Sequence, residues 1–280
     1  MKMTELQVDF HKDLVIRGFT ESTIKNYLLV VGEFEKFVGL SPELFEEKHA
    51  VNFLYDCIIN RKLKEDTVNY KNSIIKFLFV VTLNKEWNNL KVPRMKKRKT
   101  LPVVLSKSEV KEFLDSIDNL RYKTIFSVIY SGGLRLSEVA KLKVTDIDSN
   151  DMKIIVRDGK GKKDRHTLLA QSTLILLREY WKTYKPNNYL FLGKDGVNHL
   201  RNRAIQLAFT KYLNKTNIKK KAHIHTLRHS FATHLLDAGT DIIYIQRLLG
   251  HSSITTTTVY LHLRDYRVLK IQSPADLLNE

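Results

Sequence analysis

Cysteine is nearly absent from this 280-residue chain, and no long apolar run occurs in its N-terminal half. The single cysteine, Cys57, excludes an internal disulfide and a metal cluster built from cysteines. The longest apolar stretch of that half, residues 77–83, is far too short to span a bilayer. The first residues, MKMTELQVDFHKD, carry charges where a signal peptide would have an apolar core. These absences lead us to expect a soluble, cytoplasmic protein.

Acidic residues are also scarce, although only in one part of the chain. The sequence holds 47 Lys and Arg against 30 Asp and Glu, a formal net charge of +17. Residues 1–90 contain 12 basic and 13 acidic side chains, whereas residues 91–280 contain 35 and 17. Such an excess of cations indicates a polyanionic partner. A solubility device or an anionic membrane would also use this charge, but no strongly basic amphipathic helix favours the membrane.

The basic segment 91–102 is the clearest domain boundary. It contains Pro93 and Pro102 and has six Lys or Arg and no acid between Lys91 and Leu101. Because 280 residues suffice for two domains with separate cores, we expect domains at 1–90 and 103–280, joined by this linker. The segment either contacts DNA phosphates or is only a solvated connector. The candidate contacts are Arg94, Lys96, Lys97, Arg98 and Lys99.

Residues 1–90 have an all-helical apolar pattern. The periodicity predicts helices at about 4–17, 20–38 and 65–83. Between the last two, it predicts a further helix that begins after residue 41 and includes Val51, Leu54 and Ile58. Thr20 is expected to cap the second helix, and Ser41, which precedes a proline, is expected to cap the third. Three lysines near the fourth helix are candidates for facing a phosphate backbone. They are Lys64, Lys71 and Lys76.

Residues 103–280 have a mixed but mostly helical pattern. Ser106 and Glu109 form a capping-box pattern for a helix to about residue 117. Further helices are expected at 121–131, 134–141, 200–213, 226–237, 241–249 and 255–261. Two β-branched, alternating segments predict strands at 152–158 and 165–170, and residues 188–193 could add a third. The expected fold is therefore mainly α, with a helical N-terminal domain and a mostly helical second domain that contains a small antiparallel sheet.

The second domain also supplies a series of cations, histidines and one tyrosine. They are Arg135 in SGGLRLSE (131–138), Lys160 in GKGKKDR (159–165), His225 and Arg228 in HTLRHS (225–230), His251 in LLGHSSI (248–254) and Tyr260 in TTTTVYLHL (255–263). Two arginines, a lysine and two histidines could surround a pentacoordinate phosphate, with a phenol as the nucleophile. Taken singly, each residue has an ordinary structural explanation. Arg135 could simply pair with Glu138, and Tyr260 is one of 12 tyrosines.

The joint order of these motifs is more specific than any one of them. HxxR is followed by GH 23 residues after the arginine and by a tyrosine nine residues further on, with GLRxSE and GKGxKxR ahead of them. In this order the chain resembles the tyrosine recombinases, the lambda-integrase family, and among them the compact Xer recombinases. The resemblance covers nearly the whole chain, from residue 17 to the tail beyond Tyr260. It implies the tyrosine recombinase fold, with a core-DNA-binding domain before the catalytic domain.

The resemblance implies how bonds and protons would move. Tyr260 would attack the scissile phosphate and leave a 3′-phosphotyrosine and a free 5′-hydroxyl. A phenol titrates near pH 10, so it needs a base or a cationic pocket at neutral pH. His225 would be that base or a donor to a phosphoryl oxygen, and Lys160 would protonate the leaving 5′-oxygen.

The resemblance also implies how charge would be stabilised. Arg135 and Arg228 would clamp the two non-bridging oxygens, which suits planar guanidinium groups. His251 would donate one more hydrogen bond as charge develops. These groups would take the place that a divalent metal has elsewhere, so we expect no metal, cofactor or ATP.

The partners implied are a double-stranded DNA recombination site and three further copies of the chain. The two domains would close round a duplex, and a homo-tetramer on two DNA sites would exchange strands through a Holliday junction, resolving chromosome or plasmid dimers. The tail, with Leu277 and Leu278 as anchors, would dock on a neighbouring subunit or fold back on its own domain. The alternatives are an integrase of a mobile element, a type IB topoisomerase and a DNA-binding factor without catalysis. The GLRLSE and LLGHSSI motifs favour a recombinase, and the complete motif set argues against lost catalysis.

Overall fold

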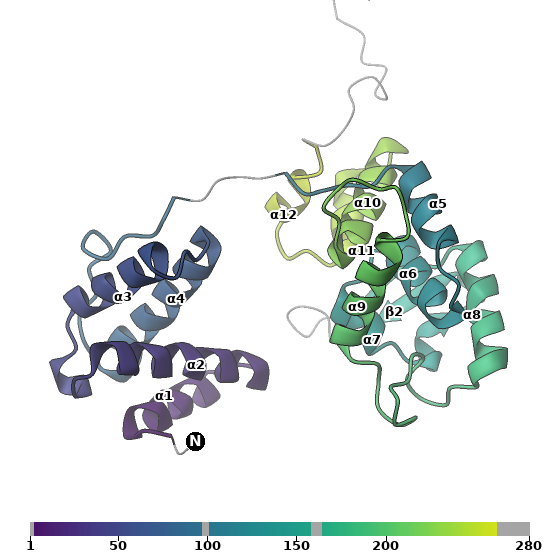
Figure 1. Cartoon of the computed structure of the whole chain (residues 1–280). Helices are drawn as coiled ribbons and strands as arrows, with labels where there is room; N and C mark the ends of the chain where they lie inside the picture. The colour runs from purple at the N-terminus through teal and green to yellow at the C-terminus, as the bar shows by residue number, and fades with distance from the viewer. Residues whose placement is uncertain (1–2, 97–100, 158–163, 262–280) are drawn as a thin grey trace, which may run out of the picture. The chain divides into compact units, whose positions relative to one another are not determined.

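The computed structural model describes residues 3–96, 101–157 and 164–261 (Figure 1). The chain divides into two compact units, residues 1–99 and 100–280. Within the described ranges, no helix combines the length and the hydrophobicity that a membrane span requires.

The first unit is built from four α-helices, as the apolar pattern predicts. They are α1 (Glu5–Ile16), α2 (Glu21–Val38), α3 (Glu47–Ile59) and α4 (Glu65–Phe77). Thr20 caps α2 by accepting a hydrogen bond from the backbone N–H of Thr23, so that predicted cap is confirmed. The fourth helix is shorter than expected, because residues Leu78–Thr82 continue it as a π-helical turn.

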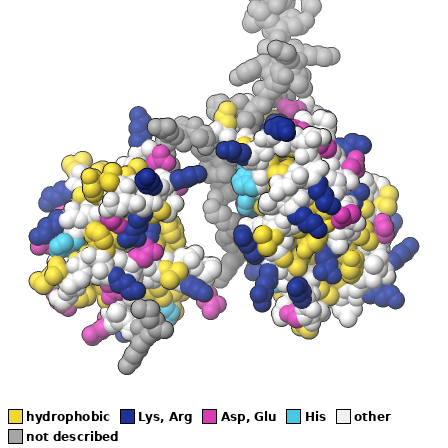
Figure 2. Space-filling model, viewed as in Figure 1, with side chains coloured by type: hydrophobic (Ala, Val, Ile, Leu, Met, Phe, Trp, Pro, Cys, Tyr) yellow, Lys and Arg dark blue, Asp and Glu magenta, His cyan; other side chains and the backbone are white. Residues whose placement is uncertain are grey.

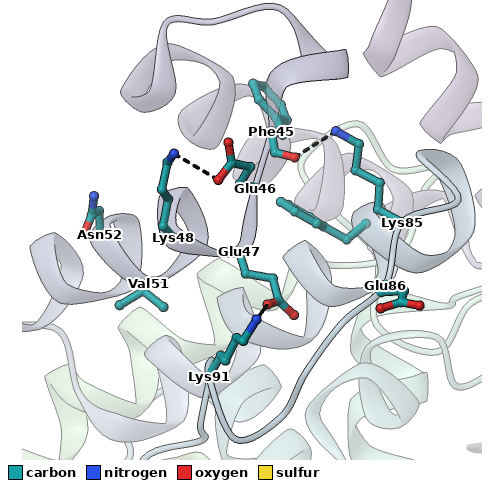
Figure 3. Close-up of a pocket in the computed structure, with 10 residues that line it drawn as sticks. Phe45, Glu46, Glu47, Lys48, Val51, Asn52, Lys85, Glu86 and Lys91 are labelled. Carbon is teal, nitrogen blue, oxygen red and sulfur yellow. Dashed lines mark hydrogen bonds and ion pairs between the residues drawn. The ribbon is translucent and has the colours of Figure 1, made fainter.

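The predicted cap at Ser41 is wrong. Residues Pro42–Leu44 form a single 3₁₀ turn, and α3 begins only at Glu47. Lys85 explains why the 3₁₀ turn does not continue as a helix. Its Nζ donates to the carbonyl oxygens of Pro42, Glu43 and Phe45 at 3.2, 2.6 and 2.8 Å. These carbonyls are therefore satisfied by a side chain instead of by a continuing helix. Figure 3 shows Lys85 reaching Phe45 at the edge of an open pocket.

Aromatic side chains fill the core of the first unit. Phe34 of α2 is fully buried, and its ring lies 5.2, 5.4 and 6.1 Å from the ring centroids of Phe45, Phe53 and Phe79. Edge-to-face and tilted contacts of this kind are the favoured arrangements for aromatic pairs. Because Phe34, Phe45 and Phe53 belong to different segments, one cluster holds α2, α3 and the turn between them together.

The first part of the predicted linker belongs to the first unit. Val92 is only 2% exposed. The amide of Asn69 donates to the Met95 carbonyl and accepts from the Met95 N–H, both at 2.9 Å. Asn72 donates to the Pro93 carbonyl at 3.1 Å. The sequence pattern missed this attachment because the prolines and cations of the segment have no apolar periodicity.

The second unit is mostly helical, with a small sheet. Its α-helices are α5 (Lys107–Asp115), α6 (Leu120–Gly132), α7 (Leu136–Ala140), α8 (Gln171–Tyr184), α9 (Asn202–Leu213), α10 (Ile224–Asp237), α11 (Ile242–Leu249) and α12 (Thr255–Thr258). Helix α6 is buried on most of its sides and packs against α8 and α10. The capping box of Ser106 and Glu109 is formed at the start of α5 as predicted.

The sheet differs from the expected one in its third strand. Its antiparallel strands are β1 (Ile147–Asp148), β2 (Lys153–Val156) and β3 (Arg165–Leu168), in the order β1-β2-β3. The prediction of a strand at 188–193 is wrong, since those residues form only isolated bridges, of Tyr189 with Lys143 and of Leu192 with His199. Helix α8 was not predicted, although its buried Leu174, Leu177 and Tyr180 follow each other at spacing three.

Gly133 fixes the path of the chain from α6 to α7. Its φ of +63° ends α6 in the left-handed region, which glycine adopts readily. A Cβ atom at this position would also overlap the ring of Phe231 on α10. The close approach brings the start of α7, and with it Arg135, to the side of α10.

Candidate active site

Arg228 lies at the centre of a network that joins three helices of the second unit. Its side chain projects from α10 and is only 4% exposed as a residue. Nη1 donates to the carbonyl of Gly133 and Nη2 to the carbonyl of Leu249, both at 2.6 Å. Burial, followed by the charge of Arg135, lowers the pKa of Arg228 to about 9. The guanidinium of Arg228 is therefore largely shielded from water and lies near a second positive charge.

Arg135 enters the same place from the N-terminus of α7. Its Nη1 donates to Glu138 Oε1 at 2.7 Å, and its Nη2 donates to the carbonyl of Gly250 at 3.2 Å. Its side chain is 21% exposed. Arg135 thus keeps an open side, while Arg228 is enclosed. The ordinary structural explanation for Arg135, an ion pair with Glu138, is correct and does not exclude a role in binding an anion.

Glu138 is a buried carboxylate that collects the arginines. Arg165 donates to both of its oxygens at 2.8 Å, and Arg228 Nη1 lies 3.8 Å from Oε2. Burial alone would raise the pKa of Glu138, but the hydrogen bonds and charge of Arg165 and the hydrogen bonds of Arg135 outweigh it and hold the pKa at about 2. One negative charge facing three guanidiniums leaves the cluster cationic and suited to an anionic ligand.

His251 connects this cluster to the segment that carries Tyr260. Its Nε2 lies 3.1 Å from Arg228 Nη2 and its Nδ1 lies 3.0 Å from Thr257 Oγ1. Because a guanidinium can only donate, Nε2 accepts and Nδ1–H donates to Thr257. Burial and the neighbouring charges of Arg228 and Arg135 lower the pKa of His251 to about 4, so the ring is neutral at pH 7.

His225 stands one turn before Arg228 on α10, and its side chain is exposed. The surrounding protein removes part of its water, and His223, Arg228 and Arg135 add positive charge, so its pKa is lowered. At pH 7 the ring is neutral and retains a nitrogen that can accept a proton.

Tyr260 follows α12 and is buried, with 2% exposure. Its ring packs in a cluster with Phe231, Ile245 and Leu249, and its hydroxyl lies 3.0 Å from Nδ1 of His229. Burial raises the pKa of Tyr260, although the charges of Arg228 and Arg135 act in the opposite direction. The structure therefore places the tyrosine beside the arginine cluster, with its hydroxyl bonded to a histidine that the motif pattern did not single out.

The structure brings Arg228 into direct contact with His251 and joins Arg135 to them through Glu138 and the carbonyl of Gly250. It places His225 on the helix of Arg228 and bonds Tyr260 to His229. Some predicted residues lie outside the described ranges, so their positions are not part of this description. They are Lys160, Lys97, Arg98, Lys99, Leu277 and Leu278.

The lysines predicted in the first unit differ in exposure. Lys71 does not face outward: it is 7% exposed, lies 2.5 Å from Glu33 Oε2, and stands over the ring of Phe53. The expectation that it faces a phosphate backbone is wrong, because this part of α4 packs on α2 and α3. Lys64 is exposed, and Lys76 is half-buried with a hydrogen bond to Asn89.

The linker cations Arg94 and Lys96 are exposed. On the face drawn in Figure 2, Lys and Arg side chains lie over both units, and those of the first unit are interspersed with Asp and Glu. This agrees with the near-neutral charge of residues 1–90.

Among the described residues, no three His, Cys, Asp or Glu side chains are placed to hold a metal ion.

Four residues of the site were not among the predicted ones. They are Glu138, Arg165, His229 and Thr257. Signals for two of them were present, since Glu138 ends GLRLSE and Arg165 ends GKGKKDR. His229 follows Arg228 directly and Thr257 lies in a run of four threonines, neither of which indicates a partner.

The comparisons with known proteins follow this geometry. Residues 103–267 match the phage integrase family, and residues 6–89 match the phage integrase N-terminal SAM-like domain. A putative integrase/recombinase, y4qK, of Sinorhizobium fredii is 36% identical over 99% of this chain and 90% of its own length. The tyrosine recombinase XerA of Pyrococcus horikoshii is 34% identical over 94% of this chain and 92% of its own. The crystal structure of a XerH site-specific recombinase bound to palindromic difH substrate, a post-cleavage complex, has a TM-score of 0.74 at 24% identity, covering 94% of this chain and 82% of that one.

The buried carboxylate predicts a specific pH dependence of stability. The folded-state pKa of Glu138, about 2, lies below its ordinary value of 4.5, so its contribution is complete above about pH 4.5 and is lost as the pH falls towards 2. Glu138→Gln should lower the free energy of unfolding at pH 7 by about 3 kcal/mol, because Arg165 and Arg135 lose their carboxylate. Denaturant unfolding at pH 7, 5 and 3 measures both effects.

In Glu138→Gln, the free energy of unfolding should also fall less between pH 5 and pH 3 than it does in the wild type. Asp151→Asn, which removes the carboxylate of an exposed ion pair with Lys153, is the matched control and should leave stability nearly unchanged. If Glu138→Gln keeps the pH slope of the wild type, the assignment of a strongly depressed pKa to Glu138 is wrong.

Proposed function

The chain belongs to the phage integrase family and is a tyrosine recombinase, an enzyme that breaks and rejoins DNA at specific sites, and we propose that it does so through Tyr260 and the cluster of Arg135, Arg228 and His251. The observation that carries this proposal is the convergence of these three side chains around residues 249–251. Nη2 of Arg228 lies 3.1 Å from His251, and Arg135 reaches the carbonyl of the preceding Gly250.

The two arginines are proposed to bind the non-bridging oxygens of the scissile phosphate. Arg135 has an exposed side that a phosphate can contact. Arg228 is buried more deeply and adds its positive charge next to that side. Both guanidiniums are held by carbonyls and by Glu138 before any substrate arrives. Preorganised donors of this kind stabilise developing charge without needing to reorient during the reaction.

In the proposed reaction the Tyr260 oxygen forms a bond to phosphorus while the bond from phosphorus to the 5′-oxygen breaks. The phenolic proton passes to a base, for which His225 is our candidate because its lowered pKa keeps it neutral at pH 7. The 5′-oxygen takes a proton from Lys160. The phosphodiester is replaced by a phosphotyrosine, so the reverse attack of a 5′-hydroxyl can rejoin the strand without ATP.

Double-stranded DNA is the proposed partner. The excess of basic residues after residue 90 supports it, and the XerH structure carries its own DNA substrate. We further propose that four copies of the chain act on two DNA sites through a Holliday junction.

The biological task we propose is the resolution of chromosome or plasmid dimers, by analogy with the Xer relatives, which match nearly the whole chain. The integrase of a mobile element is the second candidate. The specific observation that favours it is the 36% identity with a putative integrase/recombinase.

Tyr260→Phe should bind DNA but form no covalent complex with it. The substitution removes the nucleophilic oxygen and keeps the ring that packs on Phe231 and Leu249, so the fold should persist. Trapping on a nicked suicide substrate, followed by denaturing electrophoresis, measures the adduct. Tyr244→Phe, which removes an exposed phenol from α11, is the control and should form the adduct at the wild-type level. An adduct formed by Tyr260→Phe would refute the assignment.

Lys160→Ala should slow cleavage of an ordinary phosphodiester by about 100-fold or more, because the leaving 5′-oxygen loses its proton donor. A substrate with sulfur in place of that oxygen should restore the rate, since a thiolate leaves without a proton. Single-turnover cleavage of the two substrates by wild type and variant gives the comparison. Should sulfur restore nothing, another residue is the acid, and Lys162→Ala is the next variant to compare.

The two biological candidates predict different DNA sites. We expect covalent capture of the wild-type protein in genomic DNA, followed by sequencing of the trapped fragments, to return one site per chromosome or plasmid. Capture at the two ends of a mobile element would instead support the integrase. Tyr260→Phe serves as the background for this experiment.

A further inference from the structure

The hydroxyl of Tyr260 is withdrawn from the surface in this structure. The residue is 2% exposed and packs against side chains of α10 and α11. A phosphate of duplex DNA remains outside the protein surface, so an oxygen buried in this way must move before it can attack. The hydrogen bond to His229 Nδ1, at 3.0 Å with the two rings tilted by 51°, holds it in the buried position.

His229 cannot deprotonate the phenol from this position. Burial, followed by the positive charge of neighbouring side chains, lowers the pKa of His229 to about 4, while burial raises that of Tyr260 above its ordinary 10. The pKa of His229 therefore lies far below that of Tyr260, so transfer of the phenolic proton to His229 is strongly unfavourable. Both partners are therefore neutral at pH 7, and their contact is a neutral hydrogen bond.

We propose that His229 is a positioning residue that keeps Tyr260 protonated and inside the protein until DNA occupies the arginine cluster. The inference rests on the proposed role of Tyr260 as the nucleophile. Helix α10 carries both His229 and the adjacent Arg228, so one rigid element holds the withdrawn tyrosine and the phosphate-binding guanidinium.

A second contact ties the same segment to the cluster. Thr257 Oγ1 accepts from His251 Nδ1, and His251 Nε2 accepts from Arg228. Because His251 is the residue that contacts both, a phosphate that binds Arg228 and draws His251 towards it would disturb the Thr257 contact. The hydrogen bond to His229 Nδ1 and the packing of the ring would then retain Tyr260.

Removing the acceptor should release the tyrosine in the free protein. His229→Leu leaves the phenolic hydroxyl buried without a partner, which destabilises the withdrawn position. Hydrogen exchange of residues 255–260 in the DNA-free protein should rise about fivefold or more. His229→Asn, whose Oδ1 can replace Nδ1 as the acceptor, should keep the wild-type exchange rate.

A neighbouring histidine provides a matched control. His234 also lies on α10 and makes the same kind of contact, 2.9 Å from Nδ1 to the hydroxyl of Tyr130. His234→Leu should therefore lose a similar hydrogen bond without raising exchange at residues 255–260.

Single-turnover cleavage at saturating DNA completes the test. His229→Leu should cleave a suicide substrate about fivefold faster than the wild type, and His229→Asn and His234→Leu should cleave at its rate. A rate for His229→Leu that is unchanged or lower, or an Asn variant that behaves like the Leu variant, overturns the inference. Failure of the proposed function has a different signature, since adduct formation would then survive in Tyr260→Phe whatever residue stands at position 229.

Discussion

The buried carboxylate of Glu138 is the interaction on which the site depends. Three guanidiniums approach this side chain, and two of them, those of Arg228 and Arg165, are nearly enclosed by protein. Cations with so little water repel one another, so they can stay together only around a negative charge. Because one carboxylate offsets only part of their charge, the cluster remains attractive for a phosphate.

Backbone carbonyls also accept hydrogen bonds from the arginines, and two of these carbonyls belong to glycines. Gly133 and Gly250 both have φ near +60° and both stand where a Cβ atom would strike a neighbour. At Gly250 that atom would lie 2.7 Å from the side chain of Arg165. The glycines therefore serve the chemistry indirectly, since they allow carbonyl oxygens of the chain to approach the guanidiniums closely.

The predicted helices were correct where local signals were strong. Threonine or serine caps at residues 20 and 106 agreed with the apolar periodicity behind them, and both helices begin as predicted. The prediction failed at Ser41, where the distant Lys85 takes the carbonyls that a helix would have used. It also failed at 188–193, where a short apolar segment forms only isolated bridges and pairs with no strand along its length. The presence of a distant partner decided the first outcome, and the lack of a pairing strand decided the second.

The candidate site shows the same division. Its residue types could be named from the sequence, because the order of its arginines, histidines and tyrosine along the chain is characteristic of tyrosine recombinases. The burial of Lys71 against Glu33 and Phe53 followed only from how α4 packs on its neighbours. The pairing of Tyr260 with His229 likewise depends on a contact between residues 31 positions apart. Sequence by itself determined the chemistry available to this protein, since side-chain type and local periodicity are properties of short segments. Tertiary structure decided which groups meet and whether the hydroxyl of Tyr260 is exposed, since burial and partner choice arise only when distant segments pack together.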